Sequence, residues 1–294
     1  MIKTKIVPFI QKSSDYTNYA DKGYWLKRYE RIESSYEWYD DYETIKPIIK
    51  ELNIPKRSII LNIGIGNSEF SEKMYDEGYK KNYNIDFARN VIHYMKQRNK
   101  RIRSSMIFET MDILDIEYED EQFHAIFDKA TLDCVFCGID AERKINKFMN
   151  EIYRVLKPKG YFIMISNSEP EKRIKYLQND KLKFNIMVHK IENEEEDIAR
   201  INKLDIDLNF LKKDHYVYVC KKMEEEKNLN EEILENDDEE EKNEIKKDNN
   251  EELKEGEEKI NNNKLEKESS ISYIRLEEFQ KIEKSNKSNN NSKK

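Results

Sequence analysis

A short apolar run near residue 60 marks the first strand that the sequence predicts. Its apolar positions are Ile59, Ile60, Leu61 and Ile63. A run of this kind, without polar alternation, suits a parallel strand that is buried on both faces of a sheet. Gly64 and Gly66 follow and allow a tight turn, and residues 69–77 then have the pattern of a helix. A strand, a glycine turn and a helix in series are typical of a cradle for a nucleotide-like ligand, although ordinary tight turns use the same series.

Further apolar runs alternate with helical patterns along the chain. We expect strands over residues 83–86, 105–110, 124–127 and 161–165. We expect helices over residues 42–52, 88–100 and 141–156, where apolar residues recur at the helical period. Five strands that are separated by helices or long crossovers predict a doubly wound parallel sheet of the α/β class.

Two later strand-like runs differ from this alternation. They cover residues 184–191 and 215–221, and only a polar, acidic stretch lies between them. We therefore predict that they form an antiparallel pair. The expected fold is a Rossmann-like sheet of seven strands, five parallel and two antiparallel, flanked by helices.

Charge divides the chain into parts. Residues 223–294 carry 23 acidic and 14 basic side chains, whereas the rest of the chain is close to neutral. Because the Glu-, Lys- and Asn-rich part buries little apolar surface, we predict a disordered acidic tail. Residues 58–222 are the predicted core, and residues 1–57 the predicted aromatic lid and helix. In the tail, Ile271, Ile274, Phe279 and Ile282 allow one or two amphipathic helical turns, either for docking or as a transient helix without function.

The chain has no apolar stretch of signal-peptide or membrane-spanning length, so we expect a soluble, cytoplasmic protein without a membrane partner. Cys134, Cys137 and Cys220 make neither a disulfide framework nor a zinc site of four ligands, and we interpret them as buried small side chains. No metal is expected. Nucleic acid is not an expected partner, because the core has no basic stripe beyond residues 96–103.

Residues 24–42, called here the aromatic segment, are unusually rich in aromatic side chains and hold both tryptophans, Trp25 and Trp38. One interpretation is a helix that packs its aromatic face on the core. The other is a lid over the ligand, because aromatic faces can cover an adenine or a cationic sulfonium.

Acidic side chains follow the predicted strands where those strands end. Asp86 lies at the distance from Gly64 at which a carboxylate accepts hydrogen bonds from both ribose hydroxyls. Asp112 is placed to meet the exocyclic amine of an adenine. Glu69 stands where a dinucleotide-binding loop has its third glycine, and its charge disfavours a pyrophosphate. An adenosine without phosphates is the better ligand, and S-adenosylmethionine fits this description.

The sequence resembles the class I S-adenosylmethionine-dependent methyltransferases, and within them the elongation factor 1A lysine methyltransferases related to methyltransferase-like protein 13. The motifs that carry this resemblance lie at residues 24–29, 36–39, 61–68, 84–86, 109–112, 127–133 and 155–160. Two positions depart from the family pattern. Ala130 replaces a glycine, and Asn62 replaces the acid that most class I enzymes carry.

The resemblance implies a set of residues that line the cofactor pocket. Together with the glycine turn, they are Trp25, Tyr29, Trp38, Gly64, Gly66, Asp86, Phe87, Asp112, Ile113 and Lys129. It also implies methyl transfer from S-adenosylmethionine to a lysine of a protein such as elongation factor 1A.

Asp128 or Asp133 are candidates to orient the acceptor amine, and Asp133 serves equally well as a helix-start carboxylate. Two alternatives stay open for the function. One is a small-molecule methyltransferase. The other is a cofactor-binding scaffold without catalysis that recruits partners through the acidic tail.

Overall fold

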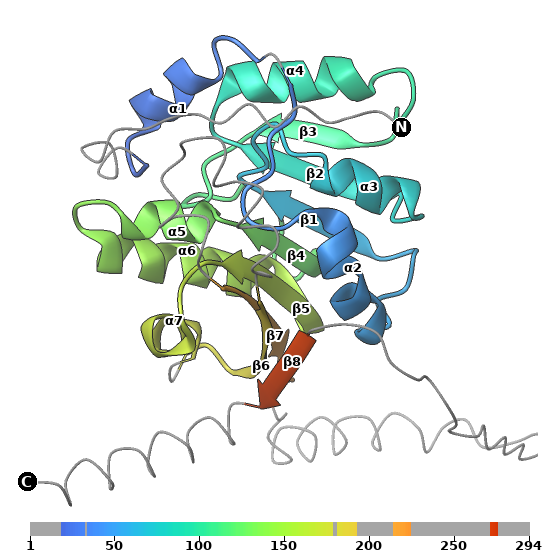
Figure 1. Cartoon of the computed structure of the whole chain (residues 1–294). Coiled ribbons are helices and arrows are strands. Elements are labelled where there is room, and N and C mark those ends of the chain that lie inside the picture. The colour runs from blue at the N-terminus through green and yellow to red at the C-terminus, as the bar shows by residue number, and fades with distance from the viewer. Residues whose placement is uncertain (1–18, 33, 179–180, 193–213, 225–270, 276–294) are drawn as a thin grey trace, which may run out of the picture. The chain divides into compact units, whose positions relative to one another are not determined.

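The computed structural model describes residues 19–32, 34–178, 181–192, 214–224 and 271–275. One mixed sheet of eight strands, in the order β3-β2-β1-β4-β5-β7-β6-β8, forms the centre of this part of the chain (Figure 1). The strands are β1 (Ile59–Ile63), β2 (Lys81–Asp86), β3 (Ile107–Thr110), β4 (Phe123–Lys129), β5 (Leu156–Ser166), β6 (Phe184–Ile191), β7 (His215–Lys222) and β8 (Ile271–Arg275).

The first five strands are parallel, as predicted, and β7 runs antiparallel between β5 and β6. The prediction of a seven-stranded α/β sheet with a final antiparallel pair is thus confirmed. The chain places β2 and β3 on one side of β1, and β4 and β5 on the other. This reversal of strand order creates a switch point beside β1, where open α/β sheets bind ligands.

The structure adds an eighth strand that the sequence analysis did not predict. Residues 271–275 pair antiparallel with β6. The prediction of helical turns is therefore wrong for these five residues, which complete a sheet edge. Apart from Met223, Glu224 and β8, the predicted disordered tail lies outside the described residues.

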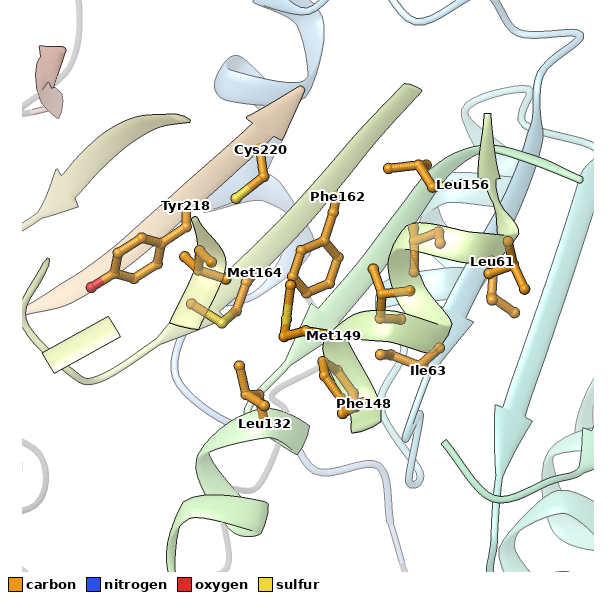
Figure 2. Packing of buried hydrophobic residues seen from close by; sticks show 14 of the residues in the cluster. Leu61, Ile63, Leu132, Phe148, Met149, Leu156, Phe162, Met164, Tyr218 and Cys220 are labelled. Carbon is orange, nitrogen blue, oxygen red and sulfur yellow. The ribbon is translucent and has the colours of Figure 1, made fainter. Parts of the chain in front are cut away.

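Helices cover both faces of the sheet. They are α1 (Lys22–Arg28), α2 (Tyr42–Glu51), α3 (Phe70–Asp76), α4 (Arg89–Asn99), α5 (Thr131–Phe136), α6 (Ala141–Val155) and α7 (Pro170–Leu177). Because successive side chains of a strand point to opposite faces, Ile60 packs with α2 and α3, whereas Leu61 and Ile63 pack with α6. Figure 2 shows the second of these layers, in which Phe148 and Met149 of α6 lie beside the sheet residues.

Across the described ranges, no helix is long and apolar enough to span a membrane, and no three metal-ligating side chains cluster as a metal site would require. The division of the chain into an aromatic lid, a core and a tail stays a prediction.

Candidate active site

A cavity of about 290 Å³ lies where β1, β2, β3 and β4 end, at the switch point of the sheet. Its volume is close to the lower end of the range for small-molecule sites, about 300–1,000 Å³. The ten residues that the resemblance implies for the cofactor all line it, namely Trp25, Tyr29, Trp38, Gly64, Gly66, Asp86, Phe87, Asp112, Ile113 and Lys129.

The glycine turn after β1 is shaped by its neighbours in the protein. Gly64 and Gly66 have φ angles of 55° and 51°, in the left-handed region that favours glycine. A Cβ at Gly64 would lie 2.1 Å from Oγ1 of Thr131, and one at Gly66 would lie 2.6 Å from the hydroxyl oxygen of Tyr29. Packing against α5 and the aromatic segment therefore requires glycine at both positions.

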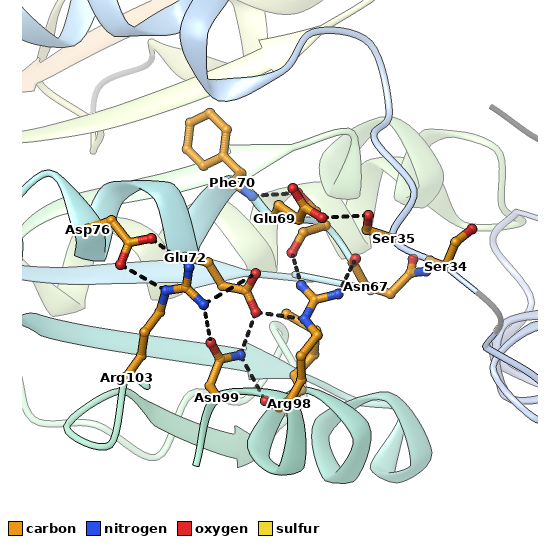
Figure 3. Close-up of polar contacts among 12 residues, drawn as sticks. Ser34, Ser35, Asn67, Glu69, Phe70, Glu72, Asp76, Arg98, Asn99 and Arg103 are labelled. Atoms are coloured by element: carbon orange, nitrogen blue, oxygen red, sulfur yellow. Dashed lines mark hydrogen bonds and ion pairs between the residues drawn. The ribbon is translucent and has the colours of Figure 1, made fainter. Parts of the chain in front are cut away.

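A partly buried ion pair supports the loop that follows the glycines, as Figure 3 shows. Arg98 of α4 donates to Oε1 of Glu72 at 2.7 Å and to the carbonyl oxygens of Asn67 and Ser68 at 3.5 and 3.3 Å. Glu72 is 5% exposed and also accepts a hydrogen bond from Asn99. Arg98 and Glu72 thus hold the loop at Asn67 and Ser68 in place through hydrogen bonds and an ion pair.

Asp86 ends β2 with a carboxylate that faces the glycine turn. Its Oδ2 accepts the Gly66 N–H at 3.0 Å, and its Oδ1 accepts the Ala88 N–H at 2.9 Å. Burial raises the pKa of Asp86 to about 6, and these two backbone N–H groups act in the opposite direction. Because a carboxylate oxygen can accept more than one hydrogen bond, Asp86 keeps acceptor capacity for hydroxyl groups in the cavity.

Asp112, in the loop after β3, is bound to the beginning of α1. Its Oδ1 accepts the Leu114 N–H at 3.0 Å, and its Oδ2 accepts Nζ of Lys22 at 2.6 Å. Burial raises the pKa of Asp112, but the Lys22 ammonium and the Leu114 N–H lower it by more, so it lies below its usual value. The same ammonium lies 5.5 Å from the centre of the Phe87 ring. Lys22 therefore contacts Asp112, which is predicted to meet the adenine amine, and lies beside Phe87, which is predicted to line the cofactor pocket.

The aromatic segment forms one wall of the cavity. The ring centres of Trp25 and Trp38 are 6.0 Å apart, and the Trp25 ring stacks on Tyr29 at 5.9 Å. Tyr36 meets Trp38 edge to face at 5.5 Å, and the indole N–H of Trp25 donates to the carbonyl oxygen of Tyr19 at 2.7 Å. The rings pack on one another and also line the cavity, and the interpretation of this segment as a lid stays a prediction.

Lys129 at the end of β4 ties the aromatic segment to the sheet. Its ammonium pairs with Glu37 and donates to the carbonyl oxygen of Trp38 at 3.1 Å. Burial lowers the pKa of Lys129, while Glu37 acts to raise it. Glu37 also accepts the Ser68 hydroxyl and the Glu69 N–H, both at 2.6 Å. A carboxylate of the protein thus occupies the beginning of α3, where a dinucleotide fold binds phosphate.

Asn62, which stands where most class I enzymes have an acid, is 4% exposed and lines the cavity. Its amide nitrogen donates to the side-chain oxygens of Asn82 and Asn84 at 3.1 and 3.2 Å. Its Oδ1 has no hydrogen-bond partner among the described residues. Asn62 thus brings a buried acceptor without a partner among the described residues to the cavity lining.

Asp128 and Asp133 are not among the residues that line the cavity. Asp128 is fully buried and accepts the N–H groups of Thr131 and Leu132 at 2.9 and 3.1 Å, at the beginning of α5. Asp133 forms a buried ion pair with Arg173, with 2.8 Å between the charged atoms. A role for either carboxylate in orienting the acceptor amine stays a prediction.

The residues present fit an adenosine without phosphates. Asp86 and Asp112 offer carboxylate oxygens to hydroxyls and an exocyclic amine, and Phe87 and Ile113 offer apolar surface to a ring. The orphaned oxygen of Asn62 suits a further donor. Glu37 at the beginning of α3 disfavours a pyrophosphate. S-adenosylmethionine has the ribose, amine and ammonium donors, and it carries no phosphate.

Lys22 and Glu37 are among the residues at the site that were not predicted from the sequence. Lys22 lines the cavity, and Glu37 fixes the aromatic segment to the glycine loop. Glu37 lies between two aromatic residues inside the motif at residues 36–39, and this position in the sequence could have indicated a role at the site. Lys22 has no comparable signal.

A family model described as a methyltransferase domain matches residues 54–255, which is more than half of the chain. The match begins before β1 and contains the glycine turn, Asp86, Asp112 and Lys129. It leaves out the aromatic segment.

Three relatives illustrate the similarity to known proteins. A mouse protein named eEF1A lysine and N-terminal methyltransferase is 36% identical over 160 residues, which is 53% of this chain and 22% of that protein. Its human counterpart is 30% identical over 181 residues, 60% of this chain and 26% of that protein. A mouse protein named EEF1A lysine methyltransferase 4 is 26% identical over 168 residues, 54% of this chain and 65% of that protein. The chain thus matches about a fifth to a quarter of the length of the first two.

Proposed function

Because this chain belongs to the methyltransferase-domain family and its cofactor is S-adenosylmethionine, we propose that it methylates a lysine side chain of a protein. Elongation factor 1A is the proposed substrate, since the relatives that match the chain are named as methyltransferases of this factor. A cytoplasmic site of action is part of the same proposal.

The observation that carries the proposal is the convergence of separate strand ends on one cavity. Asp86, Asp112 and Lys129 come from three different strand ends, and the aromatic segment closes the same space. A fold alone does not define a function, but this arrangement provides acceptors for a ribose and an adenine beside a wall of rings.

When bound, S-adenosylmethionine supplies a methyl group on a sulfonium, which an amine attacks by direct displacement. The protein contributes alignment and exclusion of water more than covalent catalysis. In this proposal Asp86 binds the ribose hydroxyls, Asp112 binds the adenine amine, and the Trp25 and Trp38 rings keep water away from the reacting centre.

The acceptor lysine must lose a proton before it reacts. With an ordinary pKa of about 10.4, reaching the neutral amine at pH 7 costs roughly 4–5 kcal/mol. An apolar, aromatic surrounding disfavours the charged ammonium and so lowers the pKa of the amine. The rings of the aromatic segment are thereby proposed to favour the neutral amine, which gives its proton to solvent water before it enters the cavity.

The test is transfer of a labelled methyl group from S-adenosylmethionine to purified elongation factor 1A and to a whole eukaryotic lysate. We expect one labelled protein band at the mass of elongation factor 1A, and its loss in Asp86→Ala. Asp120→Ala is the matched control, because Asp120 is exposed and pairs with Arg154 outside the cavity. Peptide mass spectrometry then locates the label on lysine.

Other results would contradict the proposal in distinct ways. Label in the low-mass fraction would indicate a small-molecule acceptor. Binding of S-adenosylmethionine without transfer to protein or small molecules would indicate a scaffold. An unchanged lysine methylation pattern of elongation factor 1A in cells that lack the protein would exclude that substrate.

A further inference from the structure

Trp38 is held in the cavity wall by contacts of the residues on both sides of it. Before it, Glu37 binds Lys129, the Ser68 hydroxyl and the Glu69 N–H. Its own carbonyl oxygen accepts from Lys129. After it, Tyr39 and Asp40 contact other elements, namely α5 and β7.

Tyr39 has an unusual backbone and a buried hydroxyl. Its φ of 59° lies in the left-handed region, which a bulky side chain adopts only where the surroundings enforce it. The hydroxyl donates to Oδ2 of Asp133 at 2.9 Å, and the ring lies 4.8 Å from the His215 ring. Burial, followed by the Asp133 carboxylate, raises the pKa of Tyr39, so its hydroxyl stays protonated and remains a donor.

Asp133 is itself held rigidly from the sheet side. Its carboxylate accepts the Ser166 hydroxyl at 2.7 and 2.9 Å and the Asn167 N–H at 3.2 Å. The Arg173 guanidinium donates at 2.8 and 3.2 Å and lies over the Phe136 ring, 3.8 Å from its centre. These donors belong to β5, α7 and the loop between them, so Tyr39 is the partner that connects the carboxylate to the aromatic segment.

A second buried pair fixes the next residue. Nδ1 of His215, at the beginning of β7, lies 2.9 Å from Oδ2 of Asp40, and both residues are buried. Tyr39 and Asp40 therefore fasten the C-terminal side of Trp38 to α5 and β7, while Glu37 fastens its N-terminal side to β4 and the glycine loop.

We infer that Asp133 and Tyr39 are positioning residues, which through their hydrogen bond hold Trp38 against the cofactor cavity. Asp133 acts on the site through Tyr39 and does not touch the reacting amine. The inference rests on the proposed function, since it takes the cavity to be the cofactor site.

The test uses the full chain with Tyr39→Phe, which keeps the ring and removes the hydroxyl. In a Trp25→Phe background Trp38 is the single tryptophan, because the chain has two. We expect Tyr39→Phe to increase acrylamide quenching of Trp38 fluorescence without ligand. With both tryptophans present, we expect Tyr39→Phe to weaken binding of S-adenosylhomocysteine about tenfold, as measured by calorimetry. A tenfold change in Kd corresponds to about 1.4 kcal/mol of binding free energy.

Two controls separate positioning from a general loss of stability. Ser166→Ala removes another donor from the same carboxylate, on the sheet side, and should leave Trp38 quenching unchanged. Tyr118→Phe removes a tyrosine hydroxyl that binds Glu109 and should change neither quenching nor affinity. Native quenching and native affinity in Tyr39→Phe would overturn the inference, even if the melting temperature fell. The quenching arm requires no methyl transfer, so its failure is distinguishable from failure of the proposed function.

Discussion

The hydroxyl oxygen of Tyr29 lies 2.6 Å from the place that a Cβ at Gly66 would occupy. Because Gly66 has no side chain, Tyr29 of the aromatic segment can pack against it. The same absence also leaves room for a ligand. The two roles make different predictions for the same substitution.

We predict that Gly66→Ala weakens S-adenosylhomocysteine binding by about tenfold or more, because clash and left-handed strain together cost at least about 1–2 kcal/mol. Tyr29→Phe in the same chain should restore part of the affinity, since it removes the atom that clashes. Calorimetry on both variants checks this. Gly78→Ala is the control for strain alone, because Gly78 has a φ of 109° and lies outside the cavity lining. Absence of any rescue would assign Gly66 to the ligand alone.

If Asp112 binds the adenine amine as proposed, Lys22 competes with the adenine for this carboxylate. Both oxygens of Asp112 already accept a hydrogen bond, and the Lys22 ammonium holds one of them. Because an exposed ion pair is worth about 0.2–1 kcal/mol, Lys22→Met should raise the affinity for S-adenosylhomocysteine up to about fivefold. Lys46→Met, which breaks an ion pair with Glu77 away from the cavity, should leave it unchanged. A fall in affinity would show that Lys22 anchors the ligand instead of competing with it.

The affinity for the cofactor should depend on pH through Asp86. Burial raises the pKa of this carboxyl to about 6 in the free protein. Ribose hydroxyls donate to the charged form, so its pKa is lower in the complex, and affinity must rise as pH increases through about 6. We expect S-adenosylhomocysteine to bind about tenfold more tightly at pH 7 than at pH 5, since one pKa unit corresponds to about 1.36 kcal/mol.

Asp86→Asn provides the control for that pH dependence. This variant should bind S-adenosylhomocysteine weakly, and its affinity should change less with pH because the contribution of Asp86 is gone. Asp128, whose pKa burial raises to about 7, titrates in both proteins. Parallel slopes for native and variant between pH 5 and pH 8 would contradict the assignment of Asp86 to the ribose.

Asp128 should contribute to folding more than to catalysis. Its carboxylate accepts two N–H groups at the beginning of α5. We expect Asp128→Ala to lower the free energy of unfolding in urea by about 1–3 kcal/mol, the usual range for a lost helix cap and its unsatisfied donors. The folded fraction should keep its methyl-transfer rate within about tenfold, whereas loss of a general acid or base lowers rates by about 10²–10⁴.

Asp41→Ala is the matched variant for that experiment. Asp41 caps α2 by accepting the Thr44 N–H at 3.0 Å, and it lies outside the cavity lining. The two variants should therefore lose similar stability. A rate loss of a hundredfold that is confined to Asp128→Ala would establish a direct role for Asp128 in the reaction.

The residues at strand ends were predictable because a parallel sheet brings its carboxyl ends together. Asp86 ends the predicted strand over residues 83–86, and Asp112 follows the predicted strand over residues 105–110, so their common location depends only on the fold class. The wholly apolar strands were predictable for the same reason, since burial on both faces removes polar alternation.

Contacts of the aromatic segment were not predictable in this way. Glu37 of this segment, and Lys22 at the beginning of α1 just before it, reach their partners through the path of the chain over the sheet, which no periodicity encodes. The ion pair of Asp133 with Arg173 was not predictable either, because it depends on how α7 packs. For β8, pairing with a distant edge strand overrode the helical spacing that was predicted from residue 271 on, within residues 271–275.

The contacts of Tyr39 and Asp40, which hold Trp38 in place, determine when the cavity can form during synthesis of the chain. Tyr39 and Asp133 are 94 positions apart in the sequence, and Asp40 and His215 are 175 apart. Contacts of such separation carry a large loop-closure entropy and form slowly. The aromatic segment leaves the ribosome before the sheet does, but its last partner belongs to β7. A nascent chain that ends before β7 therefore contains the residues of all five parallel strands but lacks the His215 partner of Asp40.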